Sequence, residues 1–113
     1  MRKLVIIIIL ILVIVLLGAF MYSEIQKEIQ KTACEQKGGR WEYLHHGSTF
    51  PSCNNPTSDA GKECTDSSQC ESFCQAASGT LPGTQTVGNC YGYETALCAQ
   101  EVKNGLADAT LCE

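Results

Sequence analysis

The stretch that decides how this chain folds is residues 59–74, which read Asp-Ala-Gly-Lys-Glu-Cys-Thr-Asp-Ser-Ser-Gln-Cys-Glu-Ser-Phe-Cys. Its three cysteines are separated by five and then three residues, which does not match the close C-x2-C pairs of zinc sites. An even number of cysteines in a small exported domain instead indicates disulfide bonds formed in an oxidising compartment. We therefore predict no metal or other cofactor and a disulfide framework made by all eight cysteines: Cys34, Cys53, Cys64, Cys70, Cys74, Cys90, Cys98 and Cys112.

The same part of the chain has few large apolar side chains with which to build a core. Thirteen large aliphatic or aromatic residues are spread between Trp41 and Leu111. A domain of this size gains too little folding free energy from apolar burial alone and needs covalent cross-links. Each bridge contributes about 2 to 4 kcal/mol, so a reducing agent is expected to unfold the domain.

Upstream of the cysteines lies an apolar segment. Residues 4–22 carry no charge, and residues 4–17 are all Leu, Ile or Val. At 1.5 Å per residue this segment spans the hydrocarbon core of a bilayer, and Arg2 and Lys3 predict that the N-terminus stays inside the cell. A cleaved signal peptide is the alternative, but Leu17 does not fit the small-residue pattern before a cut after Ala19, and the Thr32-Ala33-Cys34 triplet lies too far from the apolar run.

These features divide the chain into three parts. Residues 1–22 are predicted to be a transmembrane signal-anchor and residues 23–37 a helical stalk, since the stalk lacks Pro and Gly and pairs Glu24 with Lys27. Gly38 falls where a left-handed helix cap is expected. Residues 38–113, with the first cysteine already at position 34, form a disulfide-rich domain outside the cytoplasm.

The net charge of that domain limits the classes of partner that it can attract. From Ser23 onward the chain has twelve Asp and Glu residues and six Lys and Arg residues, which gives a net charge of −6. Such a domain does not attract nucleic acid or anionic lipid headgroups. The expected partners are the membrane, through residues 1–22, and an unidentified extracytoplasmic protein or envelope component.

Short β-strands and one short helix are expected inside the domain. Residues 40–44 alternate aromatic and polar side chains, which predicts a strand with Trp41 as a core anchor and Tyr43 on the same face. A capping box from Ser68 to Glu71 predicts a two-turn helix over residues 68–77. Cys70 and Cys74 would then share one helix face and bond to separate partners.

The strongest hairpin signal is Asn104-Gly105. A two-residue turn there sets Lys103 opposite Leu106, so Cys98 would face Leu111 and could not bond directly to Cys112. A three-residue bulged turn would shift the register and bring both cysteines to one face.

The remaining segments are predicted to be loops. Residues 51–62 have the composition of turns, with Asn55-Pro56 and Asp59-Ala60-Gly61 as turn sites. Residues 75–89 are uncharged and rich in Gly and Thr, and we expect a mobile connector there, or a recognition loop held between bridges. His45 and His46 are adjacent and would point to opposite faces of an extended segment, so a surface loop is predicted rather than a metal site.

The cysteine domain resembles small, uncharacterised prokaryotic exported or membrane-anchored proteins rich in cysteine. The resemblance rests on the pattern Cys-x3-Gly-Gly-x-Trp from Cys34, followed by Asp-Ala-Gly-Lys-x-Cys-x-Asp-Ser-Ser-x-Cys-x3-Cys from Asp59. It implies the compartment and the fold, and no activity.

The sequence predicts a non-enzymatic module for binding or structure, anchored to the membrane and displayed outside the cytoplasm. The alternatives are an inhibitor of an extracytoplasmic enzyme, for which residues 75–89 would be a rigid loop, and a cleaved, secreted protein. An enzyme would need His45 or His46 paired with Asp59 or Asp66, and no motif supports that pairing. No catalytic residue is therefore assigned.

Overall fold

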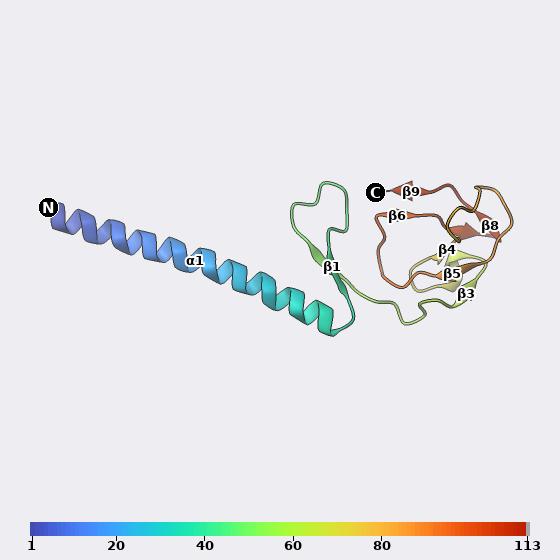
Figure 1. The fold of residues 1–113 in the computed structure, drawn as a ribbon, viewed down its shortest axis with the longest axis horizontal. Coiled ribbons are helices and arrows are strands. Elements are labelled where there is room, and N and C mark those ends of the chain that lie inside the picture. The colour runs from blue at the N-terminus through green and yellow to red at the C-terminus, as the bar shows by residue number, and fades with distance from the viewer. Residues whose placement is uncertain (113) are drawn as a thin grey trace. The chain divides into compact units, whose positions relative to one another are not determined.

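The N-terminal part of the protein is one long helix. The computed structural model describes residues 1–112, and helix α1 runs over Arg2–Gln36 without interruption (Figure 1). It is long and apolar enough to cross a membrane, and its apolar side chains are exposed. The predicted anchor and stalk are thus both helical, while their division at residues 22 and 23 stays a prediction. The Glu24–Lys27 pair is present, with Lys27 Nζ 2.7 Å from the Glu24 carboxylate.

A left-handed glycine ends α1, as predicted. Gly38 has a φ of 80°, and its N–H donates to the carbonyl of Glu35 at 2.9 Å. The N–H of Gly39 donates to the carbonyl of Cys34 at 3.0 Å. This pair of bonds is the Schellman motif, which satisfies carbonyls that the last turn of a helix leaves open. The chain can therefore leave the helix sharply, directly beside the first cysteine.

The chain separates into two compact units, Met1–Ala33 and Cys34–Glu113, and the second holds all the strands. These strands are short and antiparallel, in four small sheets. Figure 1 shows β3, β4 and β5 side by side, with β5 in the centre. The paired strands are β1 (Arg40–Glu42) with β2 (Ser52–Asn54), β3 (Glu63–Cys64) and β4 (Cys74–Gln75) on either side of β5 (Gly88–Cys90), β6 (Cys98–Ala99) with β9 (Leu111–Cys112), and β7 (Val102–Lys103) with β8 (Leu106–Ala107).

Four disulfides staple this unit, so the prediction that all eight cysteines form bridges is confirmed. The bridges are Cys34–Cys53, Cys64–Cys74, Cys70–Cys90 and Cys98–Cys112. The first ties the end of α1 to β2, the next two hold the three-stranded sheet together, and the last links β6 to β9. Cys70 and Cys74 do bond to separate partners, as expected. The fold class, a small disulfide-rich domain that follows a long apolar helix in the sequence, is also confirmed.

The core consists of sulfur and small side chains. Its buried members are Cys64, Cys74, Ala76, Cys90, Val102 and Ala107, with Cys70 packed against them. The prediction that Trp41 anchors the core is wrong, because Trp41 is only half-buried and Tyr43 is 52% exposed. Both lie in or next to the two-stranded β1–β2 sheet, whose small face cannot enclose an indole ring. The bridges take the place that a large apolar residue holds in a bigger domain.

The two-turn helix predicted over residues 68–77 is absent. A single 3-10 turn, η1 (Ser67–Gln69), stands there, and Cys74 already belongs to β4. Asp66 rather than Ser68 is the N-cap, since its side chain accepts a hydrogen bond from the N–H of Ser68. Pairing of β4 with β5 needs an extended backbone at Cys74, and this tertiary constraint overrides the local preference for a helix.

The expectation that residues 51–62 hold only turns is partly wrong. β2 lies within them, and Cys53 is the register partner of Trp41. The turn predicted at Asp59-Ala60-Gly61 is present, with Gly61 at a φ of 81° and the N–H of Lys62 donating to the carbonyl of Asp59. The strand went unrecognised because its three residues show no alternation of apolar and polar side chains.

The tight hairpin is confirmed, but the conclusion drawn from it about the cysteines is wrong. Asn104 and Gly105 have φ values of 51° and 77°, and Lys103 lies opposite Leu106. Further along, however, Cys98 lies opposite Cys112. Two residues, 100–101, face three residues, 108–110, between the two ladders. The register therefore shifts by one through a bulge in the strand, and the turn itself keeps two residues.

Residues 75–89 are anchored to the hairpin rather than forming a loose connector. The N–H of Gly83 donates to the carbonyl of Ala107 at 2.7 Å, and the N–H of Ala107 donates to the carbonyl of Thr84 at 2.9 Å. Gln85 and Leu106 form an isolated antiparallel bridge. The segment thus adds a partial third strand beside β8, which explains why a stretch with no large core residue keeps a defined path.

Candidate functional site

A hollow of about 370 Å³ opens on the surface of the disulfide-rich unit. It lies where β6, β7 and β9 come together with the segment before β4 and the segment before β6. Residues far apart in the sequence meet here because the bulge and the Cys98–Cys112 bridge bring the C-terminal strand back onto the domain. The lining residues are His45, Phe73, Glu94, Thr95, Ala96, Ala99, Glu101, Lys103, Asp108, Ala109 and Leu111.

One side of this hollow carries a charged trio. Lys103 Nζ lies 3.0 Å from Asp108 Oδ2 and 3.7 Å from Glu101 Oε2. The hydrogen bond with Asp108 and the nearby Glu101 charge raise the pKa of Lys103, and the hydrogen bond from Lys103 lowers the pKa of Asp108. Glu101 also accepts a hydrogen bond from the Ser67 hydroxyl at 2.9 Å, which ties η1 to the hairpin. All these groups are partly exposed, so each pair contributes little to stability.

An asparagine pair positions another part of the lining, Glu94 and Thr95. Asn55 Nδ2 donates to Glu94 Oε2 at 2.9 Å, and the N–H of Glu94 donates to the carbonyl of Asn55 at 3.0 Å. Asn54 is 1% exposed, and its amide donates to Glu42 Oε1 and to the carbonyl of Thr95, both at 2.7 Å. A buried amide needs such partners, so these bonds fix the segment that presents Glu94. Sequence reasoning missed both asparagines because it assigned them to a turn.

An aromatic row supports the apolar part of the hollow. The rings of Phe73 and Tyr91 stack with centroids 4.8 Å apart, and Tyr93 meets Tyr91 edge-on at 6.1 Å. The guanidinium of Arg40 lies 4.0 Å from the centre of the Tyr93 ring. Phe73 is held by this row and forms part of the lining, together with Leu111, which is 65% exposed. Aromatic stacking and cation–π contact of this kind fix ring positions at low entropic cost.

The charge of the lining is unbalanced. The described lining contains three carboxylates and one lysine ammonium: Glu94, Glu101 and Asp108, and Lys103. Within residues 1–112, Oε1 of Glu94 and Oε1 of Glu101 accept no hydrogen bond from the protein. The hollow therefore offers two carboxylate oxygens to a ligand next to an apolar surface.

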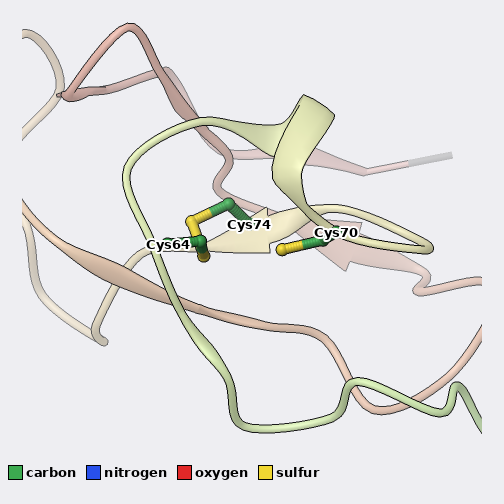
Figure 2. A group of neighbouring side chains, drawn as sticks. All are labelled: Cys64, Cys70 and Cys74. Atoms are coloured by element: carbon green, nitrogen blue, oxygen red, sulfur yellow. A yellow bond between two sulfur atoms is a disulfide. The ribbon is translucent and has the colours of Figure 1, made fainter.

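The sulfur atoms of Cys64, Cys70 and Cys74 also cluster, within 4.8 Å of one another (Figure 2). Three cysteines this close can hold a metal ion when they are thiolates. Here Cys64 and Cys74 are bonded to each other and Cys70 is bonded to Cys90, so none of the three is a thiolate. In this oxidised state the three cysteines are part of the packed core.

The residues considered for an acid–base pair lie in different surroundings. Asp59 accepts a hydrogen bond from the N–H of Glu71 at 2.7 Å, and Asp66 accepts from the N–H groups of Ser68 and Asn104. Both carboxylates thus bind backbone groups of neighbouring loops. His45 lines the hollow, as sequence reasoning did not foresee, and it lies in the exposed loop that was predicted for it.

No known protein family, curated protein or solved structure matches this chain. The resemblance to small exported cysteine-rich proteins stays a prediction. The class of protein that the structure defines is a small disulfide-rich domain that follows a long apolar N-terminal helix.

Proposed function

We propose that this protein is a non-enzymatic binding module, held at a membrane by α1, which captures a ligand in the hollow beside β6, β7 and β9. The observation that carries the proposal is the composition of that hollow: about 370 Å³, with three carboxylates, one ammonium and an apolar face. Binding sites of proteins are commonly concave and mostly apolar with a few converging polar groups. A core built from disulfides leaves these side chains on the surface and holds them in place.

The lining supports a ligand that combines an apolar stem with a positive charge, such as a Lys or Arg side chain of an extracytoplasmic protein. The stem would pack on Phe73 and Leu111 while the charge approaches Glu94 and Glu101. The net charge of −6 from Ser23 onward adds attraction at longer range. Among the described lining residues, an anionic ligand would meet three carboxylates and one lysine ammonium, with His45 nearby.

Peptide binding to the full-length chain in nanodiscs of zwitterionic lipid tests the proposal. Three fluorescent peptides of equal length differ only in carrying Lys, Ser or Glu at the same positions, and anisotropy reports binding. We expect the Lys peptide to bind tightest and to weaken with salt. Glu94→Gln and Glu101→Gln should each weaken it about threefold to fivefold, as expected for partly exposed charge pairs.

Glu63→Gln is the matched control, because it removes the same charge from an exposed position of β3 outside the hollow. It should leave peptide affinity within twofold. Equal binding of the three peptides, or an equal loss in the control, would contradict the proposal.

The placement of the domain is part of this proposal. The apolar length of α1 and the four bridges support a membrane-linked domain in an oxidising compartment, and Arg2 and Lys3 support an N-terminus that stays inside. Protease added to sealed, right-side-out membranes should then digest the domain but not the N-terminus. The intact mass of the isolated protein shows whether α1 is retained, and a mass lacking residues 1–19 would identify the secreted alternative.

An inhibitor of an extracytoplasmic enzyme is the second candidate, because residues 75–89 are held as such a loop requires. The loop lies between two disulfide-bonded cysteines, and Leu81 within it is 71% exposed. Hydrogen bonds fix it from both sides, including Gln100 Nε2 to the carbonyl of Thr80 at 2.9 Å. Timed digestion with several unrelated proteases tests this, and rapid cleavage within the loop by all of them would eliminate it.

A further inference from the structure

The two bridges of the three-stranded sheet lie close enough to exchange partners. The sulfurs of Cys64, Cys70 and Cys74 are all within 4.8 Å of one another, although Cys64 and Cys74 form one bridge and Cys70 belongs to the other (Figure 2). The side chain of Cys70 points toward the Cys64–Cys74 bridge in this view. Only a small movement separates Cys64 from a bond to Cys70.

The fourth sulfur, that of Cys90, also has an alternative partner in the strand register. Cys74 and Cys90 are direct register partners in the β4–β5 ladder. The N–H of Tyr91 donates to the carbonyl of Phe73 at 2.9 Å, so the neighbouring pair is the hydrogen-bonded one and Cys74 and Cys90 form a non-hydrogen-bonded pair. Side chains approach closest at such pairs, and Cys98 and Cys112 already show that directly opposed cysteines bond in this protein.

We propose that Cys64, Cys70, Cys74 and Cys90 form a thiol–disulfide exchange site with two pairings on one backbone: Cys64–Cys74 with Cys70–Cys90, and Cys64–Cys70 with Cys74–Cys90. The substrate is a small-molecule thiol, which enters at Cys70. Cys70 is the half-buried member, whereas the other three are at most 3% exposed.

The exchange balances without a net oxidant or reductant. An external thiolate attacks Cys70, forms a mixed disulfide and releases the Cys90 thiolate. Cys90 attacks Cys74 and releases the Cys64 thiolate. Cys64 then attacks the mixed disulfide at Cys70, which completes the second pairing and returns the external thiolate. Three sulfur–sulfur bonds form and three break, and the thiol acts as a catalyst.

Asp59 controls entry to this site. A carboxylate oxygen of Asp59 lies within 4.8 Å of the sulfurs of both Cys70 and Cys90, and Oδ1 is buried with no hydrogen-bond partner. Oδ2 of Asp59 accepts from the N–H of Glu71 but Oδ1 has no such partner, and the carboxylate charge beside the sulfurs repels the incoming thiolate and the departing Cys90 thiolate. The charge therefore slows the exchange.

Peptide mapping of the full-length protein in detergent distinguishes the two pairings by mass. The protein is incubated with glutathione at a concentration lower than that of the protein. The reaction is quenched with acid and N-ethylmaleimide, and the chain is then cleaved before Asp66 and after Glu71. No Asp or Glu lies between Ser72 and Tyr93. The first pairing thus gives three linked peptides. The second gives a two-peptide product from Cys64 and Cys70 and one looped peptide that holds Cys74 and Cys90.

We expect the second pattern to appear with glutathione and not without it. Asp59→Asn, which keeps an acceptor for the Glu71 N–H, should speed its appearance at least about threefold by removing the charge. Glu35→Gln removes an equal charge from an exposed position near the end of α1, outside the three-stranded sheet, and should leave the rate unchanged. A Cys98→Ser/Cys112→Ser variant should still exchange, which separates the site from thiols released at that exposed bridge.

Two results would overturn the exchange site, and a third would overturn the role of Asp59. One is peptide mapping that, after incubation with glutathione, finds only the first pairing and reduced protein. Another is scrambling that joins the four cysteines to Cys34, Cys53, Cys98 or Cys112 as often as to each other, which is the signature of unfolding. The third is an unchanged rate in Asp59→Asn, which would remove Asp59 from the site.

Discussion

At the scale of single residues, Asp66 links segments that are distant in the sequence. Its Oδ1 accepts from the N–H of Ser68 at 2.9 Å and its Oδ2 from the N–H of Asn104 at 2.7 Å. One carboxylate therefore caps η1 and holds the tip of the β7–β8 hairpin. Hydrogen bonds from the Ser68 side chain and from the Asn104 and Ser68 N–H groups lower the pKa of Asp66 to about 2.

This lowered pKa predicts an acid-dependent loss of stability. A carboxyl whose folded pKa lies below its ordinary value of 3.8 stabilises the fold above that value, and the stabilisation is lost as pH falls toward the folded pKa. We expect Asp66→Asn to lower the thermal unfolding midpoint near neutral pH. The gap from the parent protein should be constant down to about pH 5 and shrink toward about pH 2.

Near-UV circular dichroism of the full-length protein, recorded across this pH range, measures the effect. Glu63→Gln removes a charge without removing these hydrogen bonds and should not reproduce the trend. A gap that stays constant to pH 2 would show that Asp66 does not act through its charge.

At the scale of elements, the close contact of β4 and β5 depends on one missing side chain. A Cβ on Gly88 would lie 2.9 Å from the Gln75 carbonyl carbon, closer still to its oxygen, and 3.0 Å from Cys74 Sγ. Two of these atoms are backbone and cannot turn aside. Only glycine lets the central strand lie this close to the sulfur-rich core.

Gly88→Ala is therefore expected to destabilise the domain by about 3 kcal/mol, since an overpacked core must shift backbone atoms. Gly92→Ala is the matched control, because its Cβ would meet only Ala60 Cβ at 3.5 Å, and it should cost less than about 0.5 kcal/mol. Denaturant unfolding of both variants under oxidising conditions makes the comparison. Equal stability of the two would mean that β4 and β5 separate freely.

At the scale of the whole molecule, the four bridges differ in how far solvent reaches them. Cys98 and Cys112 are both exposed, whereas Cys64 and Cys74 are 2% and 0% exposed. The attack of a thiol on a disulfide needs access to sulfur. The exposed bridge belongs to the edge of the domain and the buried one to its core.

Stepwise reduction should follow this order, with Cys98–Cys112 opening first and the two bridges among Cys64, Cys70, Cys74 and Cys90 last. Timed alkylation followed by mass spectrometry gives the order. Loss of the first bridge should leave the rest folded, while net loss of a bridge among the four core cysteines, in either pairing, should cost about 2 to 5 kcal/mol and unfold the domain. Reduction of all four at one rate would show that global unfolding precedes attack.

Several features follow from local chemistry and could be predicted from the sequence. The apolar run predicts α1, Gly38 its end, Asn104-Gly105 a tight turn, and the even cysteine count an oxidised framework. Each of these is a preference of a few neighbouring residues that no distant contact opposes.

Contacts between distant segments set the pairing of the cysteines, the lining of the hollow and the strand at Cys74. Those outcomes depend on a one-residue bulge, on the pairing of β4 with β5, and on the buried amide of Asn54, and all of them join distant segments. Local propensity carries no information about such contacts, because their free energy arises only when the segments meet. The same reason explains why Trp41 is only half-buried while sulfur fills the core.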